Sequence, residues 1–593
     1  MSAARREYEG RYLSAQTETA RLTLQDRVLA NQRLVVFVVG IALGWSAWGA
    51  NLLSGWFILA PLTAFAALAV VHDRVIKQLE LARRRTAFHE QGIARLDGRW
   101  AGSGNPGTRY SDSGHPYAVD LDLFGRGSLF ELLCVARTRA GEETLAAWLL
   151  DPASPDVIRS RQEALRDLAP RLDLREQIAL MGDEVRSGVD PGALSAWGAE
   201  PARPFPRSVR ATALVLGVLS TCALTAWFAG YGPMALIIMA AAGRAFEIPY
   251  RNRVKSIVQA VAKPARDLEL LRLLLARLEL EPFESPLLLD LTASLALHSE
   301  SPSRRIARLQ TLVDYLRSRE NMLFTPFAAL VVWSSQFAFA IESWRAENGP
   351  QIATWLRVIG EFEALSSMAL HTFEHPDDVF PEIVDGPVCL EAEGLAHPLL
   401  SEKTAVPNDL ALGTAAHALI VSGSNMSGKS TLLRTLGVNV VLALAGAPVR
   451  ARQFRLSPVS LGASIRTQDS LQGGVSRFYA EITRLRQIME LAENRPPALF
   501  LLDEILHGTN SHDRLVGAEA VVQALMAKGA IGLVTTHDLA LARIAEDPSL
   551  AVVNVHFQDE IRDGKMSFDY RLRLGVVEKS NAIELMRSVG LPV

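Results

Sequence analysis

The 593-residue sequence has little cysteine and almost no net charge. Its three cysteines, Cys134, Cys222 and Cys389, lie far apart and none forms a C-x-x-C pair. This spacing argues against a disulfide framework or a zinc cluster and fits a reducing compartment. Lysine and arginine number 61 and aspartate and glutamate 64, which gives a net charge of −3. Because the chain lacks the basic excess typical of nucleic-acid binding, only a local basic patch would serve that purpose.

Hydrophobic residues, by contrast, make up 49% of the chain, and two long runs contain no charged residue. The first run, Leu34–Val71, is too long for one membrane span and suits two spans of ~17–20 residues with a turn at 51–55. The second run, Ala211–Gly243, is broken by glycines and a proline at 230–233. We expect two transmembrane hairpins. The alternative is that both runs are buried hairpins in a soluble core. This alternative is stronger for the second run, because its second arm at Met234–Gly243 is short.

Basic residues flank both uncharged runs, and neither central turn carries one. They are Arg21, Arg27, Arg33, Arg74, Lys77, Arg83, Arg84 and Arg85 around the first run, and Arg203, Arg207, Arg210, Arg244, Arg251, Arg253 and Lys255 around the second. Positive charge marks the cytoplasmic side of a membrane protein. A cleavable signal peptide is not expected, because a charged stretch at 1–33 precedes the first run. We therefore expect a multi-pass protein of the cell inner membrane, with every large segment in the cytoplasm.

A glycine-rich loop follows the short apolar run Ala418–Val421. It reads Gly423-Ser424-Asn425-Met426-Ser427-Gly428-Lys429-Ser430-Thr431, which matches G-x-x-x-x-G-K-[ST] and precedes a helix-like stretch. Such a loop turns backbone N–H groups toward phosphate oxygens, and the next helix presents its N-terminus to the same anion. We predict that residues 423–431 bind ATP. Lys429 would lie at the outer phosphates, and the Ser430 hydroxyl would bind Mg²⁺.

Two further apolar runs each end in a residue suited to phosphate chemistry. Ala498–Leu502 ends in Asp503-Glu504, where Asp503 would hold Mg²⁺ and Glu504 would orient or deprotonate the attacking water. Gly532–Thr536 ends at His537, which would reach the γ-phosphate. A solvated strand end and a structural histidine are the alternatives for these residues taken singly. Their order behind the glycine-rich loop favours a catalytic set of Lys429, Glu504 and His537.

These elements resemble the ABC-type ATPases, and the residues around them resemble the MutS family. Asn425-Met426 in the loop, the stretch Ile505–Asp513 and the segment at 469–481 are similar to that family. In the family this last segment reaches across a dimer to the partner's nucleotide. The resemblance therefore implies a composite site with Gly474 and Ser476 acting in trans.

A transporter ATPase is the rival interpretation of the same motifs. Leu471–Gly474 is similar to a transporter signature. Transporters usually carry proline after the Asp-Glu pair, however, and Ile505 stands there in this chain. Four predicted spans are also few for a transport pathway.

The resemblance to MutS proteins extends over about Leu121–Gly590, interrupted by the second uncharged run. Gly127–Leu133 is similar to the start of the family's helical core, and Glu363–Ala369 is similar to its lever helix. Pro407–Asp409 matches the approach to the phosphate loop, which assigns Asn408 to nucleotide binding.

Several family features are missing from the sequence. A mismatch-reading domain with a Phe-x-Glu wedge is not found, and the first uncharged run and a loop-like segment at 101–116 take its place. Ala405 stands where the family places an aromatic residue on adenine. The sequence ends at Val593 without a helix-turn-helix dimerisation tail. These departures put mismatch reading, in particular, in doubt.

The middle of the chain reads as helices of a core. Arg253–Arg319 repeats leucine at helical spacing, which predicts long helices with buried faces. Asn321–Ile341 is almost uncharged and resembles a further span, but Pro326 and its polar residues favour a buried core helix.

Together the sequence predicts a multidomain protein: a mostly α-helical N-terminal two-thirds with two transmembrane helical hairpins, then a C-terminal α/β P-loop ATPase domain of the ABC/MutS type. The predicted segments are a cytoplasmic helix at 1–33, hairpin 1 at 34–72, a helical segment and linker at 73–115, a MutS-core-like helical domain at 116–210, hairpin 2 at 211–250, lever-like helices at 251–375 and the ATPase domain at 376–593.

We expect a membrane-anchored MutS-like ATPase that hydrolyses ATP with Mg²⁺ in a dimeric composite site, as a homodimer through the ATPase domain. Mismatched or branched DNA is the expected partner, in a repair or recombination role. The alternative is a membrane regulatory or transport-coupled ABC-type ATPase that acts on a lipid or protein without DNA. A binding scaffold with little turnover is disfavoured, because binding alone needs neither Glu504 nor His537.

Overall fold

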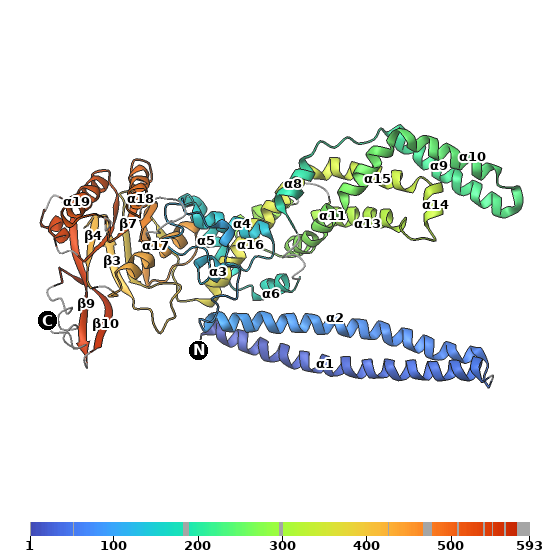
Figure 1. Ribbon diagram of the computed structural model, residues 1–593, viewed down its shortest axis with the longest axis horizontal. Coiled ribbons are helices and arrows are strands. Elements are labelled where there is room, and N and C mark those ends of the chain that lie inside the picture. Colours follow the sequence, from blue (N-terminus) through green and yellow to red (C-terminus); the bar gives the residue numbers. More distant parts are fainter. Residues whose placement is uncertain are drawn as a thin grey trace. The chain divides into compact units, whose positions relative to one another are not determined.

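The computed structural model (Figure 1) describes residues 2–50, 52–181, 189–295, 300–414, 416–424, 426–466, 477–506, 509–537, 540–547, 550–562 and 565–577. The chain divides into two compact units. Unit 1 consists of Met1–Gly104, Arg171–Leu180 and Leu400–Lys403. Unit 2 consists of Asn105–Pro170, Met181–Leu399 and Thr404–Val593.

Unit 1 is built on two long antiparallel helices, α1 (Ala3–Gly44) and α2 (Leu59–Leu96), with the short helix α6 (Leu172–Leu180) beside them. The turns η1 (Trp45–Gly49) and η2 (Gly55–Ile58) connect α1 to α2. At 1.5 Å per residue, α1 is roughly 60 Å long, so the pair extends well beyond the uncharged run. Its seam buries Leu22, Val75, Leu79 and Ala82. Close approach at the open end needs Gly92, where a Cβ would lie 2.6 Å from the Tyr8 ring.

Apolar side chains of the α1–α2 tip project outward. Trp45, Trp48 and Trp56 at the connecting turns are each more than 70% exposed. Three helical stretches among the described residues are long and apolar enough to cross a membrane by length and composition: Ala3–Gly49, Gly55–Leu96 and Arg207–Tyr231. Their most apolar windows are 0%, 6% and 22% buried inside the protein. The second arm of the second predicted hairpin is a 14-residue helix, Met234–Glu247, and is not among the three.

The helical part of unit 2 precedes two β-sheets among the described residues, as expected for a mostly helical N-terminal region followed by an α/β domain. Its α-helices are α3 (Leu129–Leu133), α4 (Arg139–Leu150), α5 (Pro155–Leu168), α8 (Pro191–Ala199), α9 (Arg207–Ala226), α10 (Met234–Glu247), α11 (Arg251–Leu280), α12 (Pro286–Leu295), α13 (Pro302–Ser318), α14 (Thr325–Leu330), α15 (Trp333–Asn348) and α16 (Ile352–Glu374). The turn η4 (Trp227–Tyr231) and Gly232 separate α9 from α10, which form an antiparallel pair.

Helix α16 is the central helix of this part and packs against α4, α5 and α12. Its Glu363 is buried and accepts hydrogen bonds from the backbone N–H groups of Arg137 (2.9 Å) and Thr138 (3.1 Å). The same carboxylate also accepts the Thr138 hydroxyl, so Glu363 holds the N-terminal end of α4 against α16.

The expectation of one buried helix at Asn321–Ile341 is wrong for the first half of this segment. Met322 and Leu323 are 87% and 92% exposed, and the helix is broken between α14 and α15. Val332 lies in the left-handed region (φ 55°), where a β-branched residue is strained and a helix cannot continue. Only the second half, α15, is buried as expected, through Ala338, Phe339 and Ile341.

The C-terminal part contains two sheets. The smaller has the order β1-β5-β2-β3, from β1 (Glu382–Ile383), β2 (Leu390–Leu395), β3 (Asn408–Leu412) and β5 (Gln453–Leu456). The larger has the order β10-β9-β4-β8-β7-β6, from β4 (Ala418–Ser422), β6 (Ser460–Ser464), β7 (Ala498–Asp503), β8 (Ile531–Thr536), β9 (Val552–Arg562) and β10 (Lys565–Leu574).

The larger sheet is parallel apart from its β10 edge. Helices α17 (Lys429–Ala445), α18 (Arg477–Leu491) and α19 (Ser511–Ala527) complete the α/β layers. Strands β4 and β8 are buried at every position. Burial on both faces explains why these strands are continuous apolar runs in the sequence.

Candidate nucleotide site

Strand order brings the three predicted motifs to one edge of the larger sheet. Strand β8 lies between β4 and β7, and all three are parallel. The carboxyl ends of parallel strands meet at the same edge, which is where α/β sheets bind ligands. The phosphate loop follows β4, Asp503 and Glu504 end β7, and His537 follows β8. The structure therefore brings together Lys429, Glu504 and His537 as the sequence predicts.

The phosphate loop is folded around Lys429 at the start of α17. Lys429 is buried, and its Nζ donates hydrogen bonds to the carbonyls of Gly423 (2.8 Å) and Ser424 (3.0 Å). Gly428 has φ 105°, a conformation that a side chain would strain. Among the described residues, the buried hydroxyl oxygens of Ser424 and Ser427 have no hydrogen-bond partner. Buried hydroxyl groups without a partner in a phosphate-binding loop are suited to donate hydrogen bonds to an anionic ligand.

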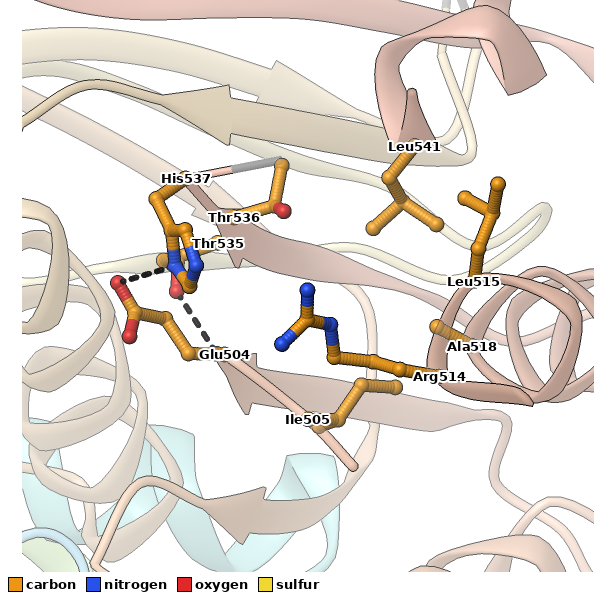
Figure 2. A pocket seen from close by; sticks show the side chains of 9 residues that line it. All are labelled: Glu504, Ile505, Arg514, Leu515, Ala518, Thr535, Thr536, His537 and Leu541. Carbon is orange, nitrogen blue, oxygen red and sulfur yellow. Dashed lines mark hydrogen bonds and ion pairs between the residues drawn. The ribbon is translucent and has the colours of Figure 1, made fainter. Parts of the chain in front are cut away.

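Glu504 links the loop to His537. Its Oε1 lies 3.3 Å from Lys429 Nζ. The same oxygen lies 3.5 Å from His537 Nδ1 (Figure 2). The Glu504 backbone has φ 47°, a left-handed conformation that is uncommon outside glycine and is often found at functional sites. The Glu504 side chain is one-quarter exposed, so it faces solvent at the edge of the sheet.

Thr535 positions both carboxylates and was not singled out in the sequence. Its Oγ1 accepts the Glu504 N–H at 3.1 Å, and its hydroxyl donates to Asp503 Oδ1. Asp503 and Thr535 are paired in the β7–β8 register. Thr535 therefore holds the turn after β7 in place from the neighbouring strand.

Residues on one side of Glu504 form a small pocket. Glu504 and His537 share it with Arg514 of α19, and with Leu541 and Thr536 (Figure 2). Figure 2 shows the Arg514 guanidinium directed from α19 into this space. Arg514 is a second cation near Glu504 that sequence reasoning missed, because no motif marks it.

The predicted Mg²⁺ ligands are Ser430, the second residue of α17, and Asp503. Both side chains are partly buried. The described residues hold no group of three or more His, Cys, Asp or Glu that could bind a metal by themselves. Mg²⁺ commonly takes one or two protein oxygens and completes its shell with phosphates and water. A hydroxyl and a carboxylate fit an ion that enters with a nucleotide.

Asn408 connects the approach to the loop with strand β10. Its Oδ1 accepts the Leu572 N–H at 2.7 Å, and its Nδ2 donates to the Tyr570 carbonyl at 3.0 Å. Tyr570 lies where the β9–β10 register shifts and has φ 55°. Its ring packs against Gly428, where an added Cβ would lie 3.1 Å from Tyr570 Cδ1. Tyr570 thus supplies an aromatic surface beside the phosphate loop, whereas Ala405 has none.

The remaining predicted site residues, Asn425, Gly474 and Ser476, lie outside the described residues. Both flanks of the segment at 467–476 are described. On one side, Asp120 Oδ1 accepts the N–H groups of Ile465 and Arg466, each at 2.7 Å. On the other, buried Glu481 of α18 accepts the N–H of Leu506. Ile465 and Arg466 are therefore held by Asp120, and α18 is held to the turn that follows Glu504.

A parallel α/β sheet with a phosphate loop, a carboxylate pair and a histidine at its carboxyl edge defines a P-loop ATPase-type domain. The model of the family MutS domain V matches residues 419–593. This part of the chain is therefore similar to the ATPase-type domain of MutS proteins.

Three relatives illustrate the extent of the similarity. The DNA mismatch repair protein MutS of Brevibacillus brevis is 31% identical over 305 residues, which covers 49% of this chain and 35% of the relative. The DNA mismatch repair protein MutS 2 of Halobacterium salinarum is 33% identical, over 42% of this chain and 28% of the relative. The endonuclease MutS2 of Thermus thermophilus is 34% identical, over 33% of this chain and 26% of the relative. The chain thus matches about a third or less of the length of these proteins.

Proposed function

We propose that this protein is a membrane-anchored MutS-like ATPase that binds and hydrolyses ATP and couples the reaction to DNA. The observation that carries the proposal is the meeting of Lys429, Glu504 and His537 at one sheet edge, where Glu504 Oε1 lies 3.3 Å from Lys429 Nζ and 3.5 Å from His537 Nδ1. Binding alone requires the phosphate loop and Lys429. A carboxylate and an imidazole directed at the same place support hydrolysis.

Each residue has a distinct part in the proposed reaction. Backbone N–H groups of residues 423–431 and Lys429 bind the phosphates. Ser430 and Asp503 would hold Mg²⁺, which would supply positive charge beside the phosphates. Glu504 orients or deprotonates the attacking water, and its left-handed backbone, fixed by Thr535, directs the carboxylate. His537 contacts the transferred phosphate. Tyr570 stacks on the adenine ring in place of the aromatic residue that Ala405 lacks.

The proposals of dimerisation and DNA binding rest on similarity to the relatives. Gly474 and Ser476 complete the site of a second copy in a homodimer, as the family resemblance implies. The relatives are called DNA mismatch repair proteins and an endonuclease. We propose mismatched or branched DNA as the ligand, in repair or recombination, with α16 as the helix that joins the helical part to the sheets.

Membrane anchoring rests on the two apolar hairpins. The most apolar windows of α1, α2 and α9 are 0%, 6% and 22% buried by the protein, so their side chains require another apolar environment. Basic residues flank both hairpins and are missing from the turns. We propose insertion in the cell inner membrane with the ATPase domain in the cytoplasm.

A second function remains in competition: a membrane regulatory or transport-coupled ATPase that acts on a lipid or protein and never binds DNA. Its support is the net charge of −3 together with the exposed hairpins. Both functions share the ATPase site and differ only in the effector.

The deciding experiment measures ATP hydrolysis by the full chain in detergent, alone and with homoduplex, mismatched or branched DNA. Glu504→Gln is the inactive blank. Glu490→Gln is the matched control, because Glu490 lies on the exposed face of α18 and pairs with Arg486 at 2.8 Å. Stimulation by one DNA form supports the proposal and names the DNA class. Turnover that no DNA changes supports the second function, and turnover no higher than that of the blank contradicts both.

A further inference from the structure

A polar pocket of about 380 Å³ lies in unit 2 at the base of the α9–α10 hairpin. Its walls come from the start of α11, from α15 and from the segment that joins α8 to α9. The residues that matter for its chemistry are Glu200, Arg203, Arg253, Ser256, Glu342 and Arg345. None of the nucleotide-site residues lines this pocket.

Two of its charged groups neutralise each other. Arg345 donates to Glu342 through Nε at 3.1 Å and Nη2 at 3.0 Å, and through Nη1 to the carbonyls of Trp197 and Glu200. The Glu342 carboxylate also accepts the Arg203 N–H at 2.9 Å. Burial acts to raise the pKa of Glu342, but these hydrogen bonds hold it below its ordinary value. Glu342 is therefore ionised, pairs with Arg345 and also lies 3.8 Å from Arg253. Glu200 is a second carboxylate in the lining and pairs with Arg345 at 3.3 Å, so two carboxylates face three arginines.

Arg253 is left with an unsatisfied donor. Its guanidinium stacks on the Phe205 ring at 3.8 Å, which fixes its position at the pocket wall. Its Nη2 lies 3.8 Å from Glu342 Oε1, too far for a hydrogen bond. Among the described residues this buried atom has no hydrogen-bond partner. A buried donor without a partner costs free energy, which an anionic oxygen in the pocket would recover.

The rest of the lining suits a ligand that carries an anionic group next to an apolar group. The Arg203 side chain is exposed at the rim, and the exposed Ser256 and Ala260, about one turn apart on α11, leave open space and a hydroxyl. Ile257 and Ile341 add apolar surface to the lining. The volume exceeds that of a phosphate ion alone, so a glycerol backbone fits beside it.

The pocket also lies on the proposed cytoplasmic side of the second hairpin. The uncharged run ends at Gly243, and the next charged residues, Arg244 and Glu247, form an ion pair at 3.1 Å. Arg253 lies ten residues after Gly243, or about 15 Å along a helix. Basic residues that follow a spanning segment are expected on the cytoplasmic side of the membrane.

We propose that this pocket binds the phosphate group of an anionic phospholipid from the cytoplasmic leaflet, with Arg253 and Arg203 as the phosphate ligands. This inference rests on the proposed membrane insertion of the α9–α10 hairpin. It makes the second hairpin a lipid-selective anchor, not only an apolar one, since basic pockets beside spanning helices recognise lipid headgroups.

The test measures the melting temperature of the full chain in uncharged detergent as phosphatidylglycerol, phosphatidylcholine or inorganic phosphate is added. We expect phosphatidylglycerol to raise the melting temperature more than phosphatidylcholine does. Arg253→Gln should weaken this lipid effect about tenfold, as the loss of one charge-assisted hydrogen bond predicts. Arg251→Gln is the matched control, because Arg251 is exposed on the same helix and does not line the pocket.

Each outcome has a definite meaning. An equal effect of both lipids on the natural chain contradicts the proposal, and so does an equal loss in Arg253→Gln and Arg251→Gln. An effect of inorganic phosphate as large as that of phosphatidylglycerol identifies a soluble phosphate ligand and overturns the lipid assignment. Should Arg253→Gln melt early without any lipid, Arg253→Lys supplies the second test, and retained selectivity there supports a charge-based site.

Membrane insertion is checked separately by incorporation into phosphatidylcholine nanodiscs. A chain that stays soluble without detergent fails the membrane proposal and this inference together. A chain that enters the nanodiscs but shows no preference for phosphatidylglycerol fails this inference alone.

Discussion

Helix α17 and the uncharged run Leu34–Val71 of the first hairpin are both rich in apolar residues but differ in what surrounds them. Nearly all of α17 from Leu432 to Ala445 is buried, between the sheet and helices α4 and α5. The most apolar windows of α1 and α2 are 0% and 6% buried. Apolar content alone therefore does not decide between a protein core and a membrane. The difference predicts that the ATPase core and the hairpins can be damaged independently.

The largest expected effect concerns the catalytic carboxylate. Glu504→Gln should lower the rate of ATP hydrolysis about 10²–10⁴-fold, because a general base contributes on that order. The amide keeps the shape of the side chain, so ATP binding and membrane recovery should be unchanged. Steady-state hydrolysis and equilibrium nucleotide binding on the same preparation check this. A mutant that still turns over ATP at the natural rate would remove Glu504 from the mechanism.

A charge inside the uncharged run of the first hairpin should have the reverse effect: it should impair membrane insertion and spare ATP hydrolysis. Leu62→Arg places a cation in the uncharged run of α2, at a cost of roughly 3 kcal/mol for a residue near the centre of a span. Membrane recovery should fall about 100-fold, and the ATPase rate in detergent should persist. Leu24→Arg is the control, because Leu24 is equally exposed on α1 but lies before the uncharged run. Equal recovery of both variants from the membrane fraction would contradict insertion of this hairpin.

Acid should act on the buried core and spare the hairpins. Burial lowers the pKa of His397 from 6.5 to about 4, with Arg434 and Arg450 adding to the effect. The unfolded chain binds this proton below pH 6.5 and the folded chain only below about pH 4. Folding stability is therefore lost as pH falls through this window, by about 3 kcal/mol from this group.

Denaturant titrations between pH 7 and pH 4 measure this loss. His397→Gln should flatten the acid decline relative to the natural chain, while His512→Gln, at an exposed position on α19, should not. An unchanged slope in His397→Gln would assign the acid sensitivity to other groups.

The smallest expected effect lies at the edge of the nucleotide site. Tyr570→Ala removes the ring that packs on Gly428 and should raise the KM for ATP about 3–10-fold, as expected for one aromatic stacking interaction. The kcat should change little, because Tyr570 does not contact the Glu504 turn. Tyr570→Phe keeps the ring and should keep the KM. A drop in kcat with an unchanged KM would show that Tyr570 acts on chemistry and not on binding.

The sequence predicted the parts of the site that end continuous apolar runs. Lys429, Glu504 and His537 could be placed together because fully buried strands are easy to recognise and parallel strands share one carboxyl edge. Thr535 and Tyr570 could not be found in this way. The role of Thr535 depends on the register that sets it opposite Asp503, and that of Tyr570 on an irregularity between β9 and β10. Register and bulges are set by tertiary packing, which a single sequence does not display.

The burial predicted for Asn321–Ile341 was also wrong in part. An uncharged run near a helical core predicted one buried helix, but the strained backbone at Val332 separates α14 from α15. Met322 and Leu323, which precede α14, are exposed. Composition correctly described the segment as apolar, but it did not predict which of its residues are buried.

The chain is helical from Met234 to Leu280, through α10, a single 3₁₀ turn at Ile248–Tyr250 and α11. Helix α11 then packs on α13, α15 and α16. A flexible linker would let the hairpin and the ATPase domain move independently, but this connection is helical throughout. A change in bilayer thickness that tilts the second hairpin would be carried as a rigid-body motion along α11 into the helix that leads to the nucleotide sheet. The anchor would then act as a mechanical input to the ATPase as well as an attachment.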